Sequence, residues 1–336
     1  MHAIFHDQRA AVVILITLAA GLLSAVCAMS HAQPAWMPQR NVELIVPSAA
    51  GGGLDRTARA VHRIWQDHKL VTTANAVVNK PGGAGTIGYT YLNQFAGNAH
   101  YVSISSPTLL TNHILGTARF THTDFTPLAQ LSSEYLLLLA RTDSPLKTAK
   151  DVFERLRKDP ASLSIAIGSV PGGTNHIGIA RVLKAAGIDV RKLKTVVFKS
   201  GSESTLALLG GHVDLSANAP EQIMRHLEGG KLRAIAIGAP QRLPGALADI
   251  PTWRELGIDV VTDTWRGMVG PKGLAPGQIA YWDGVLGKLV QTSEWRGEIE
   301  QHHWQATYRD SAASRKFLQA DYQVLKSTLT DLGLVK

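Results

Sequence analysis

Short apolar runs alternate with longer amphipathic stretches along the chain from residue 41 onward. The short runs are rich in Val, Ile and Leu, and the stretches between them are roughly ten to fifteen residues long, the length of crossover helices. This alternation is typical of α/β units with parallel strands. Strands are predicted at residues 42–47, 76–78, 101–105, 163–168, 195–198, 213–217 and 232–238.

The last part of the chain has the spacing of an amphipathic helix. Leu318, Tyr322, Leu325, Leu329 and Leu332 recur at steps of four and three residues. Such steps place the five side chains on one face of a helix. We therefore expect a closing helix whose apolar face covers another part of the protein.

Two further strand-like segments, 135–141 and 260–270, lie where the chain could pass between two α/β domains. If both are crossovers, one lobe contains residues 33–140 together with 262–336, and the other contains residues 141–261. A ligand cleft would then open at the carboxyl ends of the strands, where open α/β sheets bind ligands. A single large α/β domain is the alternative.

The N-terminal segment, residues 1–32, has the features of a secretory signal peptide. Arg9 precedes a long apolar run, and small residues end at Ala32, after which we expect cleavage and hence a periplasmic protein. One alternative is an uncleaved anchor, because residues 10–29 approach the roughly 20 apolar residues that span a bilayer. The other is a lipoprotein acylated at Cys27, which the bulky valine before that cysteine disfavours.

Composition and charge narrow the function class. Cys27 is the only cysteine, so the processed chain would have no disulfide, thiolate nucleophile or cysteine-bound metal. The formal net charge of +8 suits an acidic ligand or partner surface. Because Lys and Arg form no blocks, the pattern argues against nucleic-acid binding. We expect a monomer.

The stretch Ile45-Val-Pro-Ser-Ala-Ala-Gly-Gly-Gly-Leu-Asp55 joins an apolar strand directly to an amphipathic helix. Glycines let the main chain approach a ligand closely, and the unpaired N–H groups at the helix start favour an anion. Asp55 could instead serve only to compensate the helix dipole. We expect the following residues to contribute to an anion site: Ser48, Ala49, Ala50, Gly51, Gly52, Gly53 and Asp55.

Residues 169–176, Ser-Val-Pro-Gly-Gly-Thr-Asn-His, repeat this strand, turn and helix design. Two helix N-termini could then face one cleft from opposite sides and hold an elongated molecule with a carboxylate at one or both ends. Thr174 could be only an N-cap, and His176 only a structural hydrogen-bonding group. The candidates in this stretch are Ser169, Gly173, Thr174, Asn175 and His176.

Polar residues follow several other predicted strands. Ser106 and Thr108 offer hydroxyls that suit carboxylate oxygens, and Lys199 offers a cation. Asn218 ends the strand at 213–217, and Trp265 lies near the second crossover, where it could line the cleft or belong to the core.

The motifs of nucleotide sites, metal sites and catalytic centres are incomplete or missing. Residues 83–88 fit G-x-G-x-x-G but no acidic residue follows about twenty positions later, so we interpret them as a tight turn before a helix. His302 and His303 lack acidic partners at metal spacing, which indicates a solvated pair. We expect no enzyme, no cofactor and no metal; the alternative is a hydrolase or lyase whose groups converge only in space.

Several motifs, taken together and in order, resemble those of the periplasmic solute-binding proteins of tripartite tricarboxylate transporters, also called the Bordetella uptake gene family. The resemblance covers essentially the whole processed chain. The motifs are VPSAAGGGLD at 46–55, NKPGGAGTIG at 79–88, VPGGTNH at 170–176, KSGSESTLALLGGHVD at 199–214, GGKLRAIAI at 229–237 and DTWRGMVGPKG at 263–273.

The resemblance implies a two-lobed, type II periplasmic binding fold, with parallel or mixed sheets flanked by helices. Its cleft would close on an organic carboxylate, such as a di- or tricarboxylate or an aromatic acid, through the loops at 48–55 and 169–176. The partners would be the membrane subunits of the transporter, or alternatively a membrane receptor. The chain departs from the usual family residues at four positions that leave the ligand's identity open: Ser48 for an aromatic residue, Leu54 for Thr or Ser, Asn175 for Asp and Thr264 for Asn.

Overall fold

The computed structural model describes residues 36–168 and 170–335. From Pro38 onward the chain forms one compact unit. The expected signal peptide at 1–32, including Cys27, lies outside the described residues, and so does Ser169. Within the described part, no helix is both long and apolar enough to cross a membrane.

The first sheet has six strands in the order β11-β4-β10-β3-β1-β2. β1 pairs in parallel with β2 and β3, whereas β10 runs antiparallel to β3 and β4. We call this sheet and its helices lobe 1. Its strands are β1 Val42–Val46, β2 Asn75–Asn79, β3 Tyr101–Ser105, β4 Phe125–Tyr135, β10 Asp263–Pro271 and β11 Gln305–Arg309.

The second sheet has five strands in the order β7-β6-β8-β5-β9. β6 pairs in parallel with β7 and β8, and β5 runs antiparallel to β8 and β9. We call this sheet and its helices lobe 2. Its strands are β5 Leu137–Arg141, β6 Ser164–Gly168, β7 Lys194–Phe198, β8 Leu215–Asn218 and β9 Leu232–Ile237.

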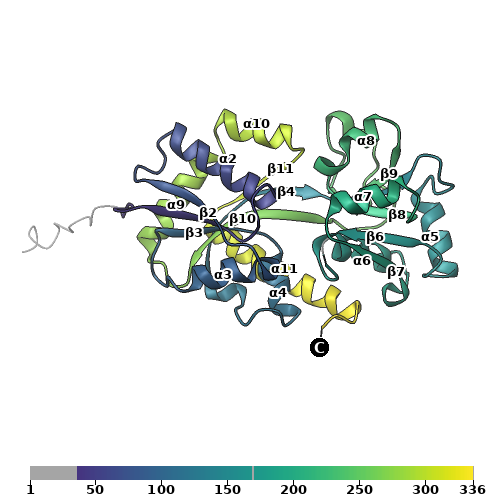
Figure 1. The fold of residues 1–336 in the computed structure, drawn as a ribbon, viewed down its shortest axis with the longest axis horizontal. Helices are drawn as coiled ribbons and strands as arrows, with labels where there is room; N and C mark the ends of the chain where they lie inside the picture. The colour runs from purple at the N-terminus through teal and green to yellow at the C-terminus, as the bar shows by residue number, and fades with distance from the viewer. Residues whose placement is uncertain (1–35, 169, 336) are drawn as a thin grey trace, which may run out of the picture. The chain divides into compact units, whose positions relative to one another are not determined.

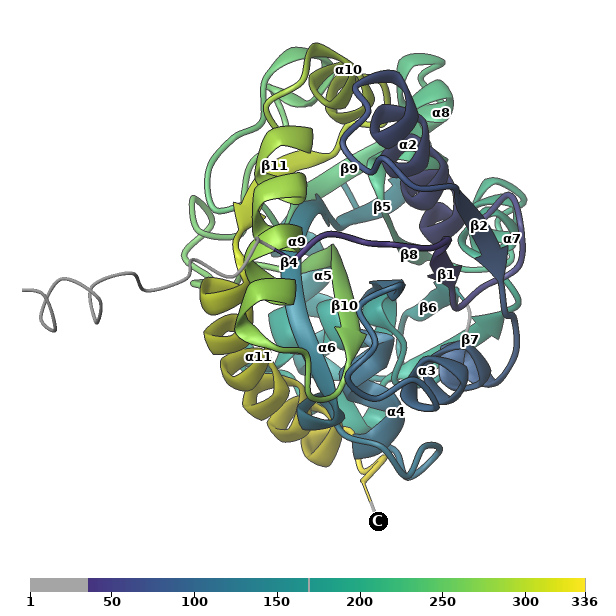
Figure 2. The same cartoon turned by 90° about the vertical axis from the view of Figure 1, so that its left-hand side faces the viewer.

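Helices cover both faces of each sheet (Figures 1 and 2). In lobe 1, α2 Gly53–Asp67, α9 Pro276–Leu289 and α10 Ser293–Gln301 pack on one face, and α3 Thr86–Asn93, α4 Thr108–Ile114 and α11 Ser311–Asp331 on the other. In lobe 2, α5 Ala149–Lys158 and α6 Thr174–Ala185 lie opposite α7 Gly201–Leu209 and α8 Met224–Glu228. The central strands of each sheet are therefore buried between helices, whereas the edge strands β2 and β7 are partly exposed.

The chain passes between the sheets twice, and the two passages hydrogen-bond to each other. The Leu136 N–H donates to the Thr262 carbonyl at 3.1 Å, and the Gly238 N–H donates to the Leu136 carbonyl at 2.8 Å. A Cβ on Gly238 would lie 1.9 Å from the Thr262 hydroxyl, so only glycine fits there. The first passage lies just before β5, which belongs to the lobe 2 sheet. The predicted lobe boundaries near residues 140 and 262 stay a proposal.

The fold class and the seven strands predicted from apolar runs are confirmed, with each observed end within two residues of the expected one. The closing helix is confirmed as α11, and the segment at 260–270 as β10. β11 and most of β4 were not predicted, because their sequences QATYR and FTPLAQLSSEY mix polar residues and a proline with few branched apolar ones. Both lie beside each other in the sheet, where their polar side chains bond to one another.

A half-buried pair of carboxylates, Asp263 and Asp321, lies where α11 packs against β10. The Trp265 indole N–H donates to the Asp321 carboxylate at 2.9 Å. Burial raises the pKa of Asp321 to about 6, and the nearby charge of Asp263 raises it as well, against the hydrogen bond from Trp265. Burial also raises the pKa of Asp263, although the Ser133 hydroxyl donates to it.

Asp321→Asn is expected to stabilise the protein at pH 7.5. The folded state keeps the Asp321 proton up to about pH 6, whereas the unfolded chain loses it near pH 4. Between these values the folded state binds more protons, so the wild type loses stability as the pH rises. The difference corresponds to at most about 3 kcal/mol. Urea unfolding at pH 4.5 and 7.5 measures it; a variant less stable than wild type at pH 7.5 would contradict the expectation.

Candidate ligand-binding site

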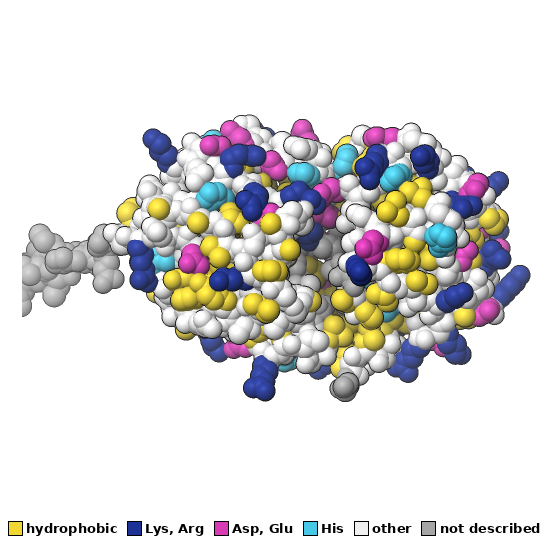
Figure 3. Space-filling view, in the orientation of Figure 1, with side chains coloured by type: hydrophobic (Ala, Val, Ile, Leu, Met, Phe, Trp, Pro, Cys, Tyr) yellow, Lys and Arg dark blue, Asp and Glu magenta, His cyan; other side chains and the backbone are white. Residues whose placement is uncertain are grey.

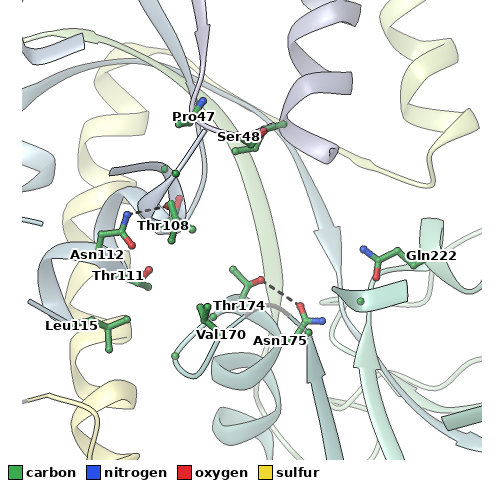
Figure 4. A pocket seen from close by; sticks show the side chains of 18 residues that line it. Pro47, Ser48, Thr108, Thr111, Asn112, Leu115, Val170, Thr174, Asn175 and Gln222 are labelled. Carbon is green, nitrogen blue, oxygen red and sulfur yellow. Dashed lines mark hydrogen bonds between the residues drawn. The ribbon is translucent and has the colours of Figure 1, made fainter. Parts of the chain in front are cut away.

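A cavity of about 390 Å³ lies between the two lobes, at the carboxyl ends of β1 and β6. The surface is hollowed between the lobes on the face seen in Figure 3, and Figure 4 shows side chains that line the cavity from both lobes. The volume falls within the range of small-molecule sites, roughly 300–1,000 Å³. Lobe 1 contributes Pro47, Ser48, Leu54, Gly82, Ala84, Gly85, Thr108, Thr111, Asn112 and Leu115; lobe 2 contributes Gly168, Val170, Gly172, Gly173, Thr174, Asn175, Gly201 and Gln222.

The cavity is polar without being charged. Among the described residues that line it, none has an ionisable side chain. Its polar groups are hydroxyls, amides and main-chain atoms, and its apolar surface comes from residues such as Leu54, Leu115 and Val170. An anion in this cavity would therefore be held by dipoles and hydrogen bonds.

α2 and α6 begin at the cavity, and no side chain caps their N-termini. α2 and α6 have Gly52 and Gly173 at their N-cap positions, and neither glycine supplies a side-chain hydrogen bond. The first N–H groups of an α-helix have no partner within the helix, and they lie at its positive end. Four other helices have N-termini capped by side chains: Thr148 for α5, Ser200 for α7, Thr292 for α10 and Asp310 for α11. The cavity thus has free main-chain donors from both lobes, which favour an anion.

Asp55 holds the first glycine turn in shape. Its carboxylate accepts from the Gly51 N–H at 2.9 Å, the Arg59 Nε at 2.8 Å and the Asn79 amide at 2.9 Å. Burial by itself would raise the pKa of Asp55, but these hydrogen bonds lower it below its usual value. Gly51 has φ of +82°, a conformation that residues with a Cβ rarely adopt. The carboxylate is therefore committed to the turn.

His176 has the same role in the second turn. Its Nδ1 accepts from the Gly172 N–H at 3.0 Å, and Gly172 has φ of +76°. Burial lowers the pKa of His176, which keeps the imidazole neutral and able to accept. The ring is therefore a structural hydrogen-bonding group in the turn.

The structure brings some of the predicted site residues to the cavity and places others elsewhere. Lys199 is exposed, and the buried Ser106 lies with its hydroxyl 3.0 Å from that of Thr108. Trp265 is 2% exposed and packs in the core beside α11. The predicted residues that line the cavity are Ser48, Thr108, Gly173, Thr174 and Asn175. The described ones outside the lining are Ala49, Ala50, Gly51, Gly52, Gly53, Asp55, Ser106, His176, Lys199, Asn218 and Trp265.

Several lining residues were missed from the sequence, although two signals point to them. Thr108, Thr111, Asn112 and Leu115 follow the i, i+3, i+4, i+7 spacing of one helix face, and all four line the cavity from α4 and its end. The turn at residues 82–85 was interpreted as structural only. It follows β2, which pairs with β1 just before Ser48, and its residues Gly82, Ala84 and Gly85 line the cavity.

The interpretation of His302 as a solvated side chain is wrong. This side chain is 16% exposed, its Nε2 lies 3.4 Å from the Glu298 carboxylate, and its ring stacks on Trp304. Glu298 precedes His302 by four residues, the spacing of neighbours on one helix face, so the sequence carried a signal for this contact. Within the described chain, no group of three or more His, Cys, Asp or Glu side chains could hold a metal ion.

Two mixed sheets joined by paired crossings, with a cavity between them, define a two-lobed ligand-binding protein. The chain belongs to the TctC family, the tripartite tricarboxylate transporter family receptors, whose model matches residues 61–334. The family and the structural neighbours are solute-binding proteins and not enzymes.

Individual relatives agree with this assignment. The chain is 26% identical to the "UPF0065 protein in gbd 5'region" of Cupriavidus necator, over 94% of this chain and 97% of that one. A TctC solute-binding protein from Polaromonas has a similar structure, with a TM-score of 0.76, 27% identity, and coverage of 88% of this chain and 99% of that one. MatC from Rhodopseudomonas palustris with bound malate has a TM-score of 0.69 at 23% identity, covering 87% of this chain and all of that one.

Asp55→Ala is expected to destabilise the protein by about 1–3 kcal/mol, because the Gly51 N–H and the Asn79 amide lose their acceptor. Urea unfolding at pH 7 measures the loss. Asp143→Ala is the matched control, since Asp143 forms only an exposed ion pair with Arg141 and should cost about 0.5 kcal/mol or less. Equal losses in the two variants would show that Asp55 does not hold the turn.

Proposed function

We propose that this chain is a periplasmic protein that captures an organic carboxylate and delivers it to a tripartite tricarboxylate-type membrane transporter. Residues 1–32 would be its cleaved signal peptide, and the lobes would follow the predicted ranges, residues 33–140 with 262–336 and residues 141–261, except that lobe 2 would begin with β5 at residue 137. The ligand would be a di- or tricarboxylate or an aromatic acid, bound by a monomer in the cavity between the lobes.

The observation that carries this proposal is the pair of uncapped helix N-termini at one cavity. A carboxylate at Ser48 and the start of α2 would meet main-chain donors at a positive dipole end, and the start of α6 offers the same to a second polar group. The Thr108 hydroxyl can donate to a remaining carboxylate oxygen. Membership in a transporter-receptor family and the malate bound to MatC support both the ligand class and the partner.

An ion pair across the cleft supports closure of the lobes around the ligand. Arg56 of α2 in lobe 1 pairs with Glu221, which precedes the cavity residue Gln222 in lobe 2. The Arg56 Nη1 also donates to the Gly51 carbonyl at 3.0 Å. Burial raises the pKa of Glu221, against the effect of the Arg56 charge. Arg56 thus connects the first glycine turn with the opposite lobe.

Thermal unfolding with di- and tricarboxylates and aromatic acids tests the proposal. A ligand present at one hundred times its dissociation constant should stabilise the protein by about 2.7 kcal/mol. Gly52→Val should remove this stabilisation, because a side chain would stand beside the free N–H groups of α2. The fold should tolerate Val, since the backbone is extended there and a Cβ meets nothing closer than 3.6 Å. No stabilisation of the wild type by any carboxylate would overturn the proposal.

Glu221→Gln should weaken ligand binding about two- to fivefold, the range for a partly exposed ion pair. It should also reduce the dependence of the affinity on salt, because the charge attraction across the cleft is lost. Calorimetric titration at low and high salt measures both effects. Glu255→Gln is the control, because the Arg242–Glu255 pair lies within lobe 2, away from the cavity. The closure role fails if the two variants bind alike.

A further inference from the structure

Asn175 presents a hydrogen-bond acceptor to the cavity. Its Nδ2 donates to the Ala217 carbonyl at 2.6 Å and to the Asn218 Oδ1 at 3.2 Å, so both amide hydrogens are used inside lobe 2. A backbone carbonyl can only accept, which fixes the orientation of the amide. The Asn175 Oδ1 then faces Thr174, whose hydroxyl donates to it over 3.4 Å, a long and weak contact (Figure 4).

Asn218 reinforces this orientation from the core. It is fully buried, and its Nδ2 lies within hydrogen-bond distance of three hydroxyls, those of Ser204 at 3.1 Å, Thr205 at 3.2 Å and Ser216 at 2.8 Å, which its two hydrogens share. Its Oδ1 is therefore directed at Asn175. A rotated Asn175 would face both the Ala217 carbonyl and this oxygen with an oxygen of its own, which is repulsive. Asn218 is a positioning residue for Asn175.

The other lobe has the same arrangement at Asn112. This residue lines the cavity from α4 and is 2% exposed. Its Nδ2 donates to the Ala84 carbonyl at 3.1 Å and to the Thr86 hydroxyl at 3.2 Å. No described residue donates to the Asn112 Oδ1. Each lobe therefore brings to the cavity one amide whose donors are already occupied. The Asn112 oxygen accepts from no described residue, and the Asn175 oxygen accepts only the long, weak contact from Thr174.

We propose that Asn112 and Asn175 select a carboxylate that also carries a hydrogen-bond donor, a hydroxyl or an amino group, along its carbon chain. This inference rests on the proposed function, because the carboxylate itself is held at the helix N-termini. The two amide oxygens repel a carboxylate oxygen and accept from a hydroxyl or N–H. A ligand without such a donor leaves a desolvated amide oxygen unpaired, which costs binding energy.

The experiment compares pairs of acids that differ only in the donor group. Calorimetric titration of the purified protein uses malate and aspartate against succinate, and citrate against tricarballylate. Wherever at least one acid of a pair binds, the acid with the donor group should bind about tenfold more tightly than the acid without it. Malate and aspartate distinguish a hydroxyl from an ammonium group as the preferred donor. Equal affinities within these pairs would overturn this inference and leave the proposed function standing, whereas binding of no carboxylate would overturn both.

Asn175→Ala and Asn112→Ala locate the preference. Each should bring the affinity ratio of a pair closer to one, and the double variant should reduce it to less than about twofold. The affinity for the acid without the donor should change less than about threefold. Asn75→Ala is the matched control, because Asn75 also donates to a backbone carbonyl, that of Thr73, but lies outside the cavity lining. A preference that persists in the double variant would also overturn the inference.

Discussion

The main-chain N–H groups at the starts of α2 and α6 have no partners within their helices, and the structure keeps them available at the cavity. A Ser, Thr or Asp at the N-cap would occupy one of them, as happens at four other helices of this chain. Glycine at the N-cap avoids this but leaves the turn flexible. Asp55 and His176 compensate by bonding to the turns from behind, so each donor set is fixed without being consumed.

The two passages of the chain between the sheets determine where these donors meet. They are paired by short backbone hydrogen bonds, and Gly238 allows the close approach. Because β10 begins immediately after the second passage, the inner strands of lobe 1 and the crossing are continuous. The Arg56–Glu221 pair is a further contact between the lobes. The lobes are thus connected by two covalent passages and by a reversible ion pair.

Much of the fold could be predicted from the sequence, because the buried parallel strands are short apolar runs with helices between them. β11 and most of β4 were not predicted, because strands whose polar side chains hydrogen-bond to each other lack the apolar pattern used to recognise a strand. The two glycine turns could be predicted because glycine after a strand allows a tight turn and a close approach of the main chain to a ligand. Asn112 was not predicted because its role depends on α4 facing the cavity. Trp265 was predicted as a site residue because the sequence does not reveal its hydrogen-bond partner in the core, Asp321, which lies far along the chain. The residues that were predicted wrongly are those whose role depends on the direction of the side chain. Sequence spacing does not give that direction for an isolated residue.

The absence of ionisable side chains from the described cavity lining has an electrical consequence. Because none of the described lining side chains can take up or release a proton when an anion binds, the complex would differ from the empty protein by the ligand's full negative charge. A basic chain with a formal charge of +8 would become less positive, and the change would be localised at the cleft. A surface that touches the rim of the cleft would therefore sense the difference between the empty and loaded states as a change in local potential, even where the contacting side chains stay in place.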